Sequence, residues 1–202
     1  MIKWVRIVTW ALVACLVAAT GWLVWAGRTG EGPAAVTTTG EAAVGGPFTL
    51  VDQDGKPVTE ALVAGKPYAV FFGFTHCPDV CPTTLADMAL ALKEMGPEAD
   101  DLKVLFITVD PERDTPDILK SYVASFSDRI VALTGTEAQI ADVVEKYRVY
   151  RRKVPNEDGT DYAMDHTAAV YLMGPDGRFR GTISYGEPQA DALAKLKRLV
   201  AG

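Results

Sequence analysis

The sequence predicts a three-layer α/β sandwich preceded by one transmembrane helix. Two observations predict the sandwich. Short apolar runs alternate with helical stretches after residue 47, and the chain then closes with a strand hairpin and a last helix. A third observation predicts the membrane helix, because residues 7–26 contain no charged side chain. As a helix they would rise about 30 Å, which is the thickness of a bilayer's hydrocarbon core.

The residues around the apolar segment predict an uncleaved anchor. Lys3 and Arg6 outnumber the single basic residue that follows the segment, so residues 1–6 are expected in the cytoplasm and the rest of the chain in the periplasm. A cleaved signal peptide is the alternative, but no small-residue cleavage site follows the apolar core. Residues 12–15, LVAC, resemble a lipoprotein processing box, yet the apolar stretch continues well beyond them. In an uncleaved anchor, Cys15 is an ordinary apolar membrane residue.

Composition separates a linker from a folded domain. Residues 27–46 are rich in Gly, Thr and Ala and contain no aromatic residue, so they cannot build a core and are expected to form a flexible linker. The folded domain then spans residues 47–202. Hydrophobic residues make up 49% of the chain, which is ample for a packed core, and a net charge of −6 argues against a nucleic-acid partner.

The first half of the domain contains two predicted central strands. Residues 48–59 read as a β-hairpin that turns at an Asp-Gly pair. Residues 68–74, YAVFFGF, form a continuous apolar run of the kind found in buried strands. A helix with one apolar face is expected over residues 82–95, and a second buried strand over residues 102–110.

Two capped helices are expected next. Thr115 is a typical N-cap residue and Pro116 fits the first helical turn. Residues 129–135 read as a short strand, and Thr136 caps a helix that reaches about Tyr147.

The last quarter of the chain predicts a protruding hairpin and the closing elements. Polar residues 150–166 carry a turn signal near their middle, so they are expected to form an inserted hairpin loop. Strands follow at 167–173 and 179–185, and a helix at 188–200. This order, β–α–β–α followed by β–β–α, is the thioredoxin arrangement, with an additional N-terminal β-hairpin.

Cys77 and Cys81 lie at the turn between the first central strand and its helix. Open α/β sheets build their sites at this edge. Residues four apart on a helix share a face, so the two thiols can bind one metal ion or, with modest adjustment, form a disulfide. A helix N-terminus also lowers thiol pKa values. A purely structural disulfide is the least favoured alternative, because so short a ring stabilises the fold little. Three residues separate the thiols, whereas thioredoxin-type reductases have two.

Only two histidines could complete a metal site with the thiols. His76 adjoins Cys77, so its side chain is expected to point away from the pair. His166 lies where the long hairpin meets the next strand, and in this fold that loop packs beside the cysteine turn. Two thiolates and one imidazole suit copper, in the form of Cu(I) or Cu(II), with zinc as the competitor.

Three segments of the domain resemble a known family. They are GFTHCPDVCPTTL at 73–85, VDPERDTP at 109–116 and DHTAAVYLMGPDG at 165–177. All three look like the Sco/SenC family of copper-binding proteins, and they occur in the same order. The resemblance implies a thioredoxin-like fold and a role in assembling the binuclear copper site in subunit II of cytochrome c oxidase.

The resemblance also implies which residues bind copper. Carried over, the ligands are the two cysteines of the first motif and the histidine of the third, namely Cys77, Cys81 and His166. The implied partners are subunit II and other periplasmic copper chaperones. The implied location is the inner membrane, crossed once, with the domain in the periplasm.

Five further residues are candidates for the surroundings of the metal site. Asp79 lies between the thiols, where its charge could bias metal exchange or contact a partner; the alternative is an ordinary carboxylate on a surface loop. Asp110, Arg113 and Asp114 lie at the end of the second central strand and are expected to order the loop there through ion pairs. Asp165 is expected to orient His166, as outer carboxylates often do.

Two functions use the same thiols. The first is a copper chaperone, which is not an enzyme in the strict sense and needs His166. The second is a thiol-disulfide oxidoreductase that reduces the cysteines of the oxidase copper site, and it needs only Cys77 and Cys81. A peroxidase is a weaker third possibility, because related peroxidases share the strand order but not the paired thiols with a histidine.

Overall fold

The computed structural model describes residues 2–29 and 43–202, which belong to two separate units. The first contains one helix, α1 (Ile2–Thr29), which includes the whole predicted membrane segment. Within it, Lys3–Trp22 is long and apolar enough to cross a membrane. The predicted linker at 27–46 lies mostly outside the described residues, and the domain boundaries therefore stay predictions.

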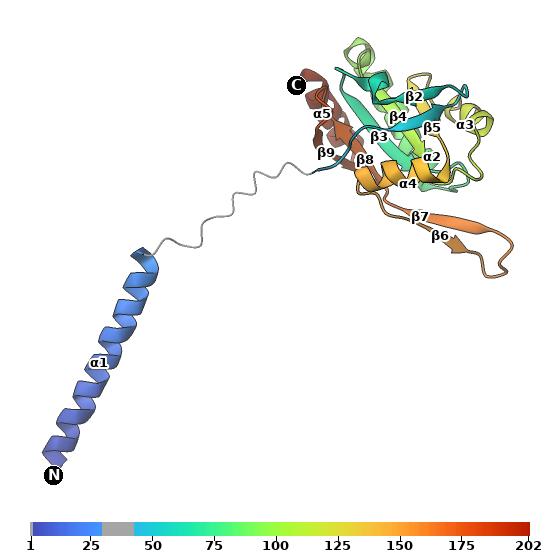
Figure 1. Cartoon of the computed structure of the whole chain (residues 1–202). Helices are drawn as coiled ribbons and strands as arrows, with labels where there is room; N and C mark the ends of the chain where they lie inside the picture. Colours follow the sequence, from blue (N-terminus) through green and yellow to red (C-terminus); the bar gives the residue numbers. More distant parts are fainter. Residues whose placement is uncertain (1, 30–42) are drawn as a thin grey trace. The chain divides into compact units, whose positions relative to one another are not determined.

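The second unit is built on one mixed sheet of seven strands in the order β2-β1-β5-β4-β3-β8-β9 (Figure 1). Three parallel strands lie at its centre: β3 (Tyr68–Gly73), β4 (Lys103–Thr108) and β5 (Ile130–Thr134). Four antiparallel strands flank them: β1 (Thr49–Asp52), β2 (Pro57–Thr59), β8 (Ala169–Met173) and β9 (Phe179–Ser184). The predicted hairpin at 48–59 is confirmed as β1 and β2, and the predicted α/β fold class is confirmed with it.

Helices cover both faces of this sheet. They are α2 (Val80–Met95), α3 (Pro116–Val123), α4 (Glu137–Lys146) and α5 (Gln189–Ala201). The crossovers through α2 and α3 move in one direction across the sheet, so their right-handedness puts both helices on one face. α4 lies on the other face, because Tyr147 at its C-terminal end packs on Phe72, whose side chain points away from the face covered by α2. α5 packs against α2.

Local chemistry explains where the helices begin. The Thr115 side chain accepts a hydrogen bond from the N–H of Ile118, and Thr136 forms a capping box with Gln139, as both caps predicted. α2 begins at Val80 and not at residue 82 as expected. The chain tolerates Pro82 there, because N–H groups in the first turn have no intrahelical partner. Two short 3₁₀ turns, η1 (Glu60–Val63) and η2 (Gly96–Ala99), were not predicted.

A separate two-stranded sheet leaves the main sheet after α4. Its strands are β6 (Arg151–Pro155) and β7 (Tyr162–His166), which pair antiparallel and protrude from the rest of the unit, as Figure 1 shows. The predicted inserted hairpin is thereby confirmed. His166 is the last residue of β7 and pairs with Arg151, so it lies at the base of the hairpin, next to the sandwich.

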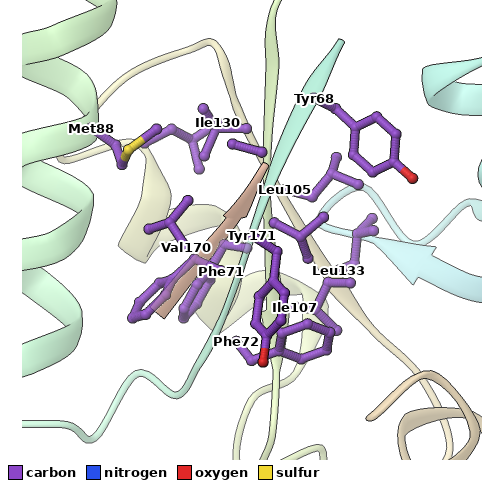
Figure 2. Close-up of a cluster of buried hydrophobic side chains, with 14 of the residues drawn as sticks. Tyr68, Phe71, Phe72, Met88, Leu105, Ile107, Ile130, Leu133, Val170 and Tyr171 are labelled. Atoms are coloured by element: carbon purple, nitrogen blue, oxygen red, sulfur yellow. The ribbon is translucent and has the colours of Figure 1, made fainter. Parts of the chain in front are cut away.

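The core is centred on β3 and β4 (Figure 2). All residues of β3 are buried, because the strand lies between β4 and β8 and has helices over both faces. Phe72 makes an edge contact with Tyr171 of β8, with ring centroids 6.0 Å apart. Phe71 stacks on Phe106 at 6.0 Å and also reaches the ring of His166 at 6.2 Å. One core aromatic residue thus supports a predicted metal ligand directly.

Candidate metal centre

The fold brings the three predicted ligands together. Cys77 lies in the loop after β3, Cys81 in the first turn of α2, and His166 at the end of β7. Their ligand atoms all lie within 4.8 Å of one another. The Sγ atom of Cys81 is 3.6 Å from Nε2 of His166. Cys81 is fully buried, whereas Cys77 and His166 are partly exposed, so the site opens to solvent on one side.

Cys81 has its place because Gly73, at the end of β3, has no side chain. A Cβ atom at Gly73 would lie 2.8 Å from Sγ of Cys81 and 2.7 Å from Cε2 of Phe106. Both distances are shorter than carbon and sulfur atoms tolerate. The end of the central strand therefore has to be a glycine for the sulfur to occupy this position.

The two thiols differ in charge. The thiol of Cys81 donates a hydrogen bond to Cys77 and lowers the pKa of Cys77 to about 4, with further help from backbone N–H groups. One of those groups is the N–H of Cys81, 3.3 Å from Sγ of Cys77. The same sulfur–sulfur hydrogen bond, together with burial, raises the pKa of Cys81. At neutral pH the pair therefore carries one negative charge and one shared proton, which a metal cation would displace.

The ring of His166 is held in one orientation. Its Nδ1 atom lies 3.1 Å from the carbonyl oxygen of Thr167. A carbonyl can only accept, so Nδ1 carries the proton and the lone pair of Nε2 faces the thiols. Phe74 packs edge-on against the ring, with centroids 5.8 Å apart, and Phe71 supports it from another side. Such support fixes a metal ligand before the metal arrives.

Asp165 does not orient His166, contrary to the expectation from sequence. Successive side chains of a strand point to opposite faces, so Asp165 points outward when His166 points inward. Its carboxylate forms an exposed ion pair with Arg152 at 2.9 Å. The backbone carbonyl of Thr167 contacts the imidazole instead.

His76 and Asp79 lie on the surface of the cysteine loop. His76 is exposed, and its Nδ1 atom lies 3.2 Å from the hydroxyl of Thr75. Asp79 is also exposed and accepts a hydrogen bond from the hydroxyl of Tyr185 at 3.4 Å. Neither side chain belongs to the cluster of possible metal ligands.

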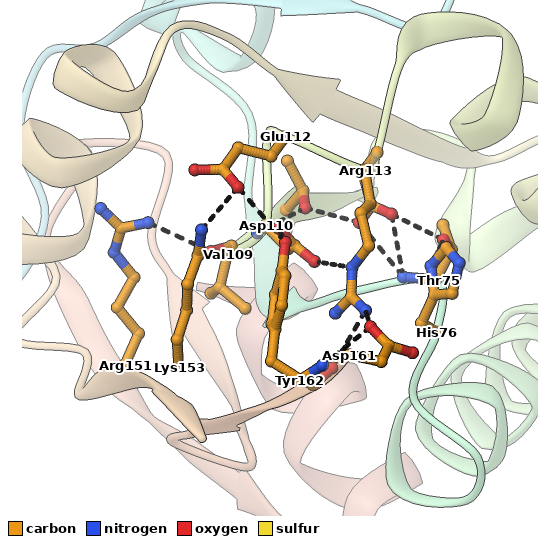
Figure 3. A network of polar contacts seen from close by, with 12 residues as sticks. Thr75, His76, Val109, Asp110, Glu112, Arg113, Arg151, Lys153, Asp161 and Tyr162 are labelled. Carbon is orange, nitrogen blue, oxygen red and sulfur yellow. Dashed lines mark hydrogen bonds and ion pairs between the residues drawn. The ribbon is translucent and has the colours of Figure 1, made fainter. Parts of the chain in front are cut away.

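Asp110 and Arg113 order the loop after β4 (Figure 3). Nε of Arg113 donates to the fully buried carboxylate of Asp110, and the two form an ion pair. The hydroxyl of Tyr162 donates to the same carboxylate at 2.9 Å. Burial, together with this hydrogen bond to Asp110, raises the pKa of Tyr162 to about 12, so its hydroxyl remains a donor at neutral pH.

Asp114 ties the same loop to the cysteine loop. Its buried carboxylate accepts hydrogen bonds from the hydroxyls of Thr75 and Thr108, both at 2.6 Å, and from the backbone N–H of Thr75. Burial raises the pKa of Asp114. Thr75 stands two residues before Cys77, so this carboxylate holds the start of the ligand loop.

Sequence reasoning missed three side chains that support the centre: Phe71, Phe74 and Tyr162. A signal for Tyr162 was present, because residues 162–166 alternate as Tyr-x-Met-x-His, and an alternating strand puts those three on one face. The contribution of the two phenylalanines depends on how β3 meets β7. No local sequence pattern contains that information.

Two sulfur atoms and one imidazole nitrogen make a small, soft and partly open ligand set. Such a set suits copper, and zinc is the competitor, although structural zinc sites are usually closed by four ligands. The described residues contain no other group of three or more His, Cys, Asp or Glu side chains placed to hold a metal ion.

The chain is similar to known proteins over most of its length. The family model described as SCO1/SenC matches residues 36–201. The solved structure of copper-bound ScoI from Bradyrhizobium japonicum is 52% identical, covering 78% of this chain and 99% of that one, with a TM-score of 0.72. BsSco is 28% identical, covering 79% of this chain and 94% of that one, with a TM-score of 0.61. Its structure is described as revealing a disulfide switch in a member of the Sco family of cytochrome c oxidase assembly proteins.

A mitochondrial SCO1 homolog from Homo sapiens is 43% identical over 159 residues, which are 78% of this chain and 53% of the human protein. The chain spans about half the length of the curated relatives it matches. The matched family and the structural similarity confirm the predicted thioredoxin-like fold. On these grounds the chain belongs to the SCO1/SenC family.

Proposed function

We propose that this protein is a copper chaperone that binds the ion through Cys77, Cys81 and His166. The proposal depends on one observation: three ligand atoms from two distant parts of the chain lie within 4.8 Å of one another. Their chemistry supports copper, because thiolates favour Cu(I) and an added imidazole also suits Cu(II). ScoI, a relative with 52% identity, was solved with copper bound.

The proposed destination of the copper is the binuclear site in subunit II of cytochrome c oxidase, with other periplasmic copper chaperones as further partners. Support comes from the description of BsSco as a member of a family of oxidase assembly proteins. Helix α1 supports an anchor that crosses the inner membrane once, with the domain in the periplasm. A partly open site suits a protein that takes up copper and then releases it.

A second candidate function is thiol-disulfide exchange. Cys77 is partly exposed and has a pKa of about 4, while Cys81 is buried behind it with a raised pKa. This pattern fits an attacking thiolate with a resolving thiol. In this function the pair would reduce the cysteines of the oxidase copper site, and His166 would have no role as a ligand.

The test is a metal titration of the full chain in detergent, comparing wild type with His166→Ala. Cu(II) binding should weaken by at least the roughly 10- to 100-fold seen when outer contacts of metal sites are removed, because a direct ligand is lost. Cu(I) binding should be retained in part by the two sulfur atoms. His76→Ala is the matched control, because His76 is exposed and adjoins Cys77 without joining the cluster.

The two candidate functions give different results in this comparison. Unchanged Cu(II) affinity and an unchanged spectrum in His166→Ala would refute His166 as a ligand and favour the oxidoreductase. Disulfide exchange by Cys77 and Cys81 should be nearly the same in wild type and His166→Ala. Oxidising the two thiols to a disulfide should abolish copper binding, and reduction should restore it, because the metal needs deprotonated, reduced sulfur.

A further inference from the structure

The position of His166 depends on a hairpin that is not part of the main sheet. β6 and β7 pair only with each other. An isolated two-stranded hairpin is marginally stable in water, so contacts with the sandwich have to fix its place. Such contacts lie at the base, where Nη1 of Arg151 donates to the carbonyl of Val109 at 3.1 Å and the guanidinium pairs with Glu137 of α4. They hold the start of β6, and the direction of β7 also depends on contacts farther along the hairpin.

Arg113 provides a second contact, farther along the hairpin. Its Nη1 atom donates to the backbone carbonyl of Tyr162 at 3.0 Å and to the carboxylate of Asp161 at 2.9 Å (Figure 3). Its guanidinium lies over the Tyr162 ring, with Cζ 3.8 Å from the ring centroid. Its third nitrogen, Nη2, is buried and has no hydrogen-bond partner among the described residues.

This arginine is itself fixed to the sandwich. Nε pairs with Asp110, which is fully buried directly after β4, and the hydroxyl of Tyr162 donates to the same carboxylate. Both the ring and the backbone of Tyr162 are therefore tied to the central sheet. A planar guanidinium can make these contacts together, whereas a lysine ammonium cannot.

The contacts of Tyr162 are transmitted along β7 to the metal centre. Tyr162, Met164 and His166 share the inward face of the strand, while Ala163 and Asp165 are exposed. His166 lies four residues along the strand from Tyr162, which is about 13 Å of extended backbone. Holding Tyr162 therefore fixes both the direction of β7 and the face that it turns to the thiols.

Arg113 also reaches the centre by a shorter route. Its Cζ atom lies 6.0 Å from the ring centroid of Phe74. Phe74 in turn packs edge-on against the imidazole of His166 at 5.8 Å. The same guanidinium thus contacts the strand that carries the imidazole and the aromatic residue that supports it.

We propose that Arg113 and Tyr162 form a clamp that positions His166 against Cys77 and Cys81. Neither residue touches the metal, so both are positioning residues. The inference rests on the proposed function, because it assumes that His166 is a ligand. When the clamp is loosened, β7 samples other directions and the imidazole spends less time near the thiols. Cu(II), which depends on the imidazole, loses affinity, and Cu(I), which the sulfur atoms hold, changes little.

The experiment measures Cu(I) and Cu(II) affinity, the Cu(II) spectrum and the unfolding temperature of the metal-free full chain in detergent. Tyr162→Leu removes the ring and the hydroxyl. Tyr162→Phe keeps the ring under the guanidinium but loses the bond to Asp110. Arg113→Lys keeps the positive charge but loses the planar guanidinium that contacts Asp110 and Tyr162 together. Arg152→Ala is the matched control, because it breaks an exposed ion pair with Asp165 on the outer face of the same hairpin.

In Tyr162→Leu, Cu(II) affinity should fall about 10-fold or more, as for outer contacts of other metal sites, with a changed spectrum. Its Cu(I) affinity should stay close to the wild-type value. Tyr162→Phe and Arg113→Lys should give intermediate losses, and Arg152→Ala should match wild type. If Tyr162→Leu does not fold, Arg113→Lys decides by the same criteria.

Two results would overturn the clamp. One is a wild-type Cu(II) affinity and spectrum in Tyr162→Leu. The other is an equal loss of affinity for Cu(I) and Cu(II) that is proportional to the fall in unfolding temperature across the variants. A purely structural role of the two residues would give that result. His166→Ala, measured alongside, separates this failure from a failure of the proposed function. If that variant binds Cu(II) like wild type, the ligand assignment is wrong; if it loses Cu(II) and Tyr162→Leu does not, only the clamp is wrong.

Discussion

Replacing Gly73 with alanine should damage the metal centre although it replaces no ligand. The new Cβ atom would lie 2.7 Å from Cε2 of Phe106 and 2.8 Å from Sγ of Cys81. Carbon atoms pack at about 3.5–4.0 Å, so the overlap with Phe106 is roughly 1 Å. Both neighbours are fully buried, and neither is the end of a flexible side chain. Overpacking of this kind costs about 1–3 kcal/mol.

The strain in Gly73→Ala has to be relieved by moving either Phe106 or Cys81. β4 holds Phe106 in the centre of the sheet, whereas Cys81 lies in the first turn of α2, where a helix has the fewest hydrogen bonds. We therefore expect the sulfur to move away from His166, which it now approaches to 3.6 Å. Copper affinity should fall along with the unfolding free energy.

Urea unfolding and copper titration of the same Gly73→Ala sample measure the two effects. The control is Leu196→Ala, which leaves a cavity under α5 and should lower the free energy of unfolding by about 2–5 kcal/mol. Leu196 is fully buried, and its neighbour Lys197 lies near Glu98, at the opposite end of α2 from Cys81. This control should lose stability but keep wild-type copper affinity. Unchanged stability and copper affinity in Gly73→Ala would show that the end of β3 does not confine the sulfur.

Two more predictions concern the buried carboxylate and the anchor. Burial raises the pKa of Asp114 above its ordinary value of 3.8, so the native state holds this proton more tightly than the unfolded state. The stability that this group contributes is therefore fully present below pH 3.8 and is lost as the pH rises through the native pKa. The urea midpoint of Asp114→Asn, relative to that of wild type, should rise from pH 4 to pH 7. Parallel pH profiles of the two midpoints would refute this. The full chain should stay in the membrane after carbonate extraction and a chain lacking residues 1–29 should not, while a mature N-terminus beyond residue 20 would refute the uncleaved anchor.

Sequence patterns predict the sandwich well because each of its elements has a local signal. β3 reads as an apolar run since helices bury both of its faces, and Thr115 and Thr136 bond to N–H groups only three residues away. The start of α2 was missed by two residues. A proline is compatible with several positions in the first turn, so Pro82 does not specify which one it occupies.

The surroundings of His166 are less predictable, because they depend on long-range packing. Alternation along β7 predicts which residues share a face, and it also shows that Asp165 cannot reach the imidazole beside it. It does not predict that Arg113, 49 residues before Tyr162, lies over that ring. The pairing arises only when the loop after β4 and the hairpin meet in space.

The fold gives this site an affinity that its motifs alone cannot supply. Cys81 and His166 are 85 residues apart in the chain. Bringing them together in an unfolded chain would cost about 4 kcal/mol in loop-closure entropy. In the folded protein they are already adjacent before the metal binds, so metal binding does not bear this cost. Cys77 and Cys81 remain close neighbours even in the unfolded chain, so the unfolded state keeps much of its capacity for Cu(I) and little for a three-ligand Cu(II) site. A ligand stabilises the native state only to the extent that it binds the native state more tightly than the unfolded state. If the native protein binds the two ions with equal affinity, Cu(II) should therefore raise the unfolding temperature more than Cu(I) does.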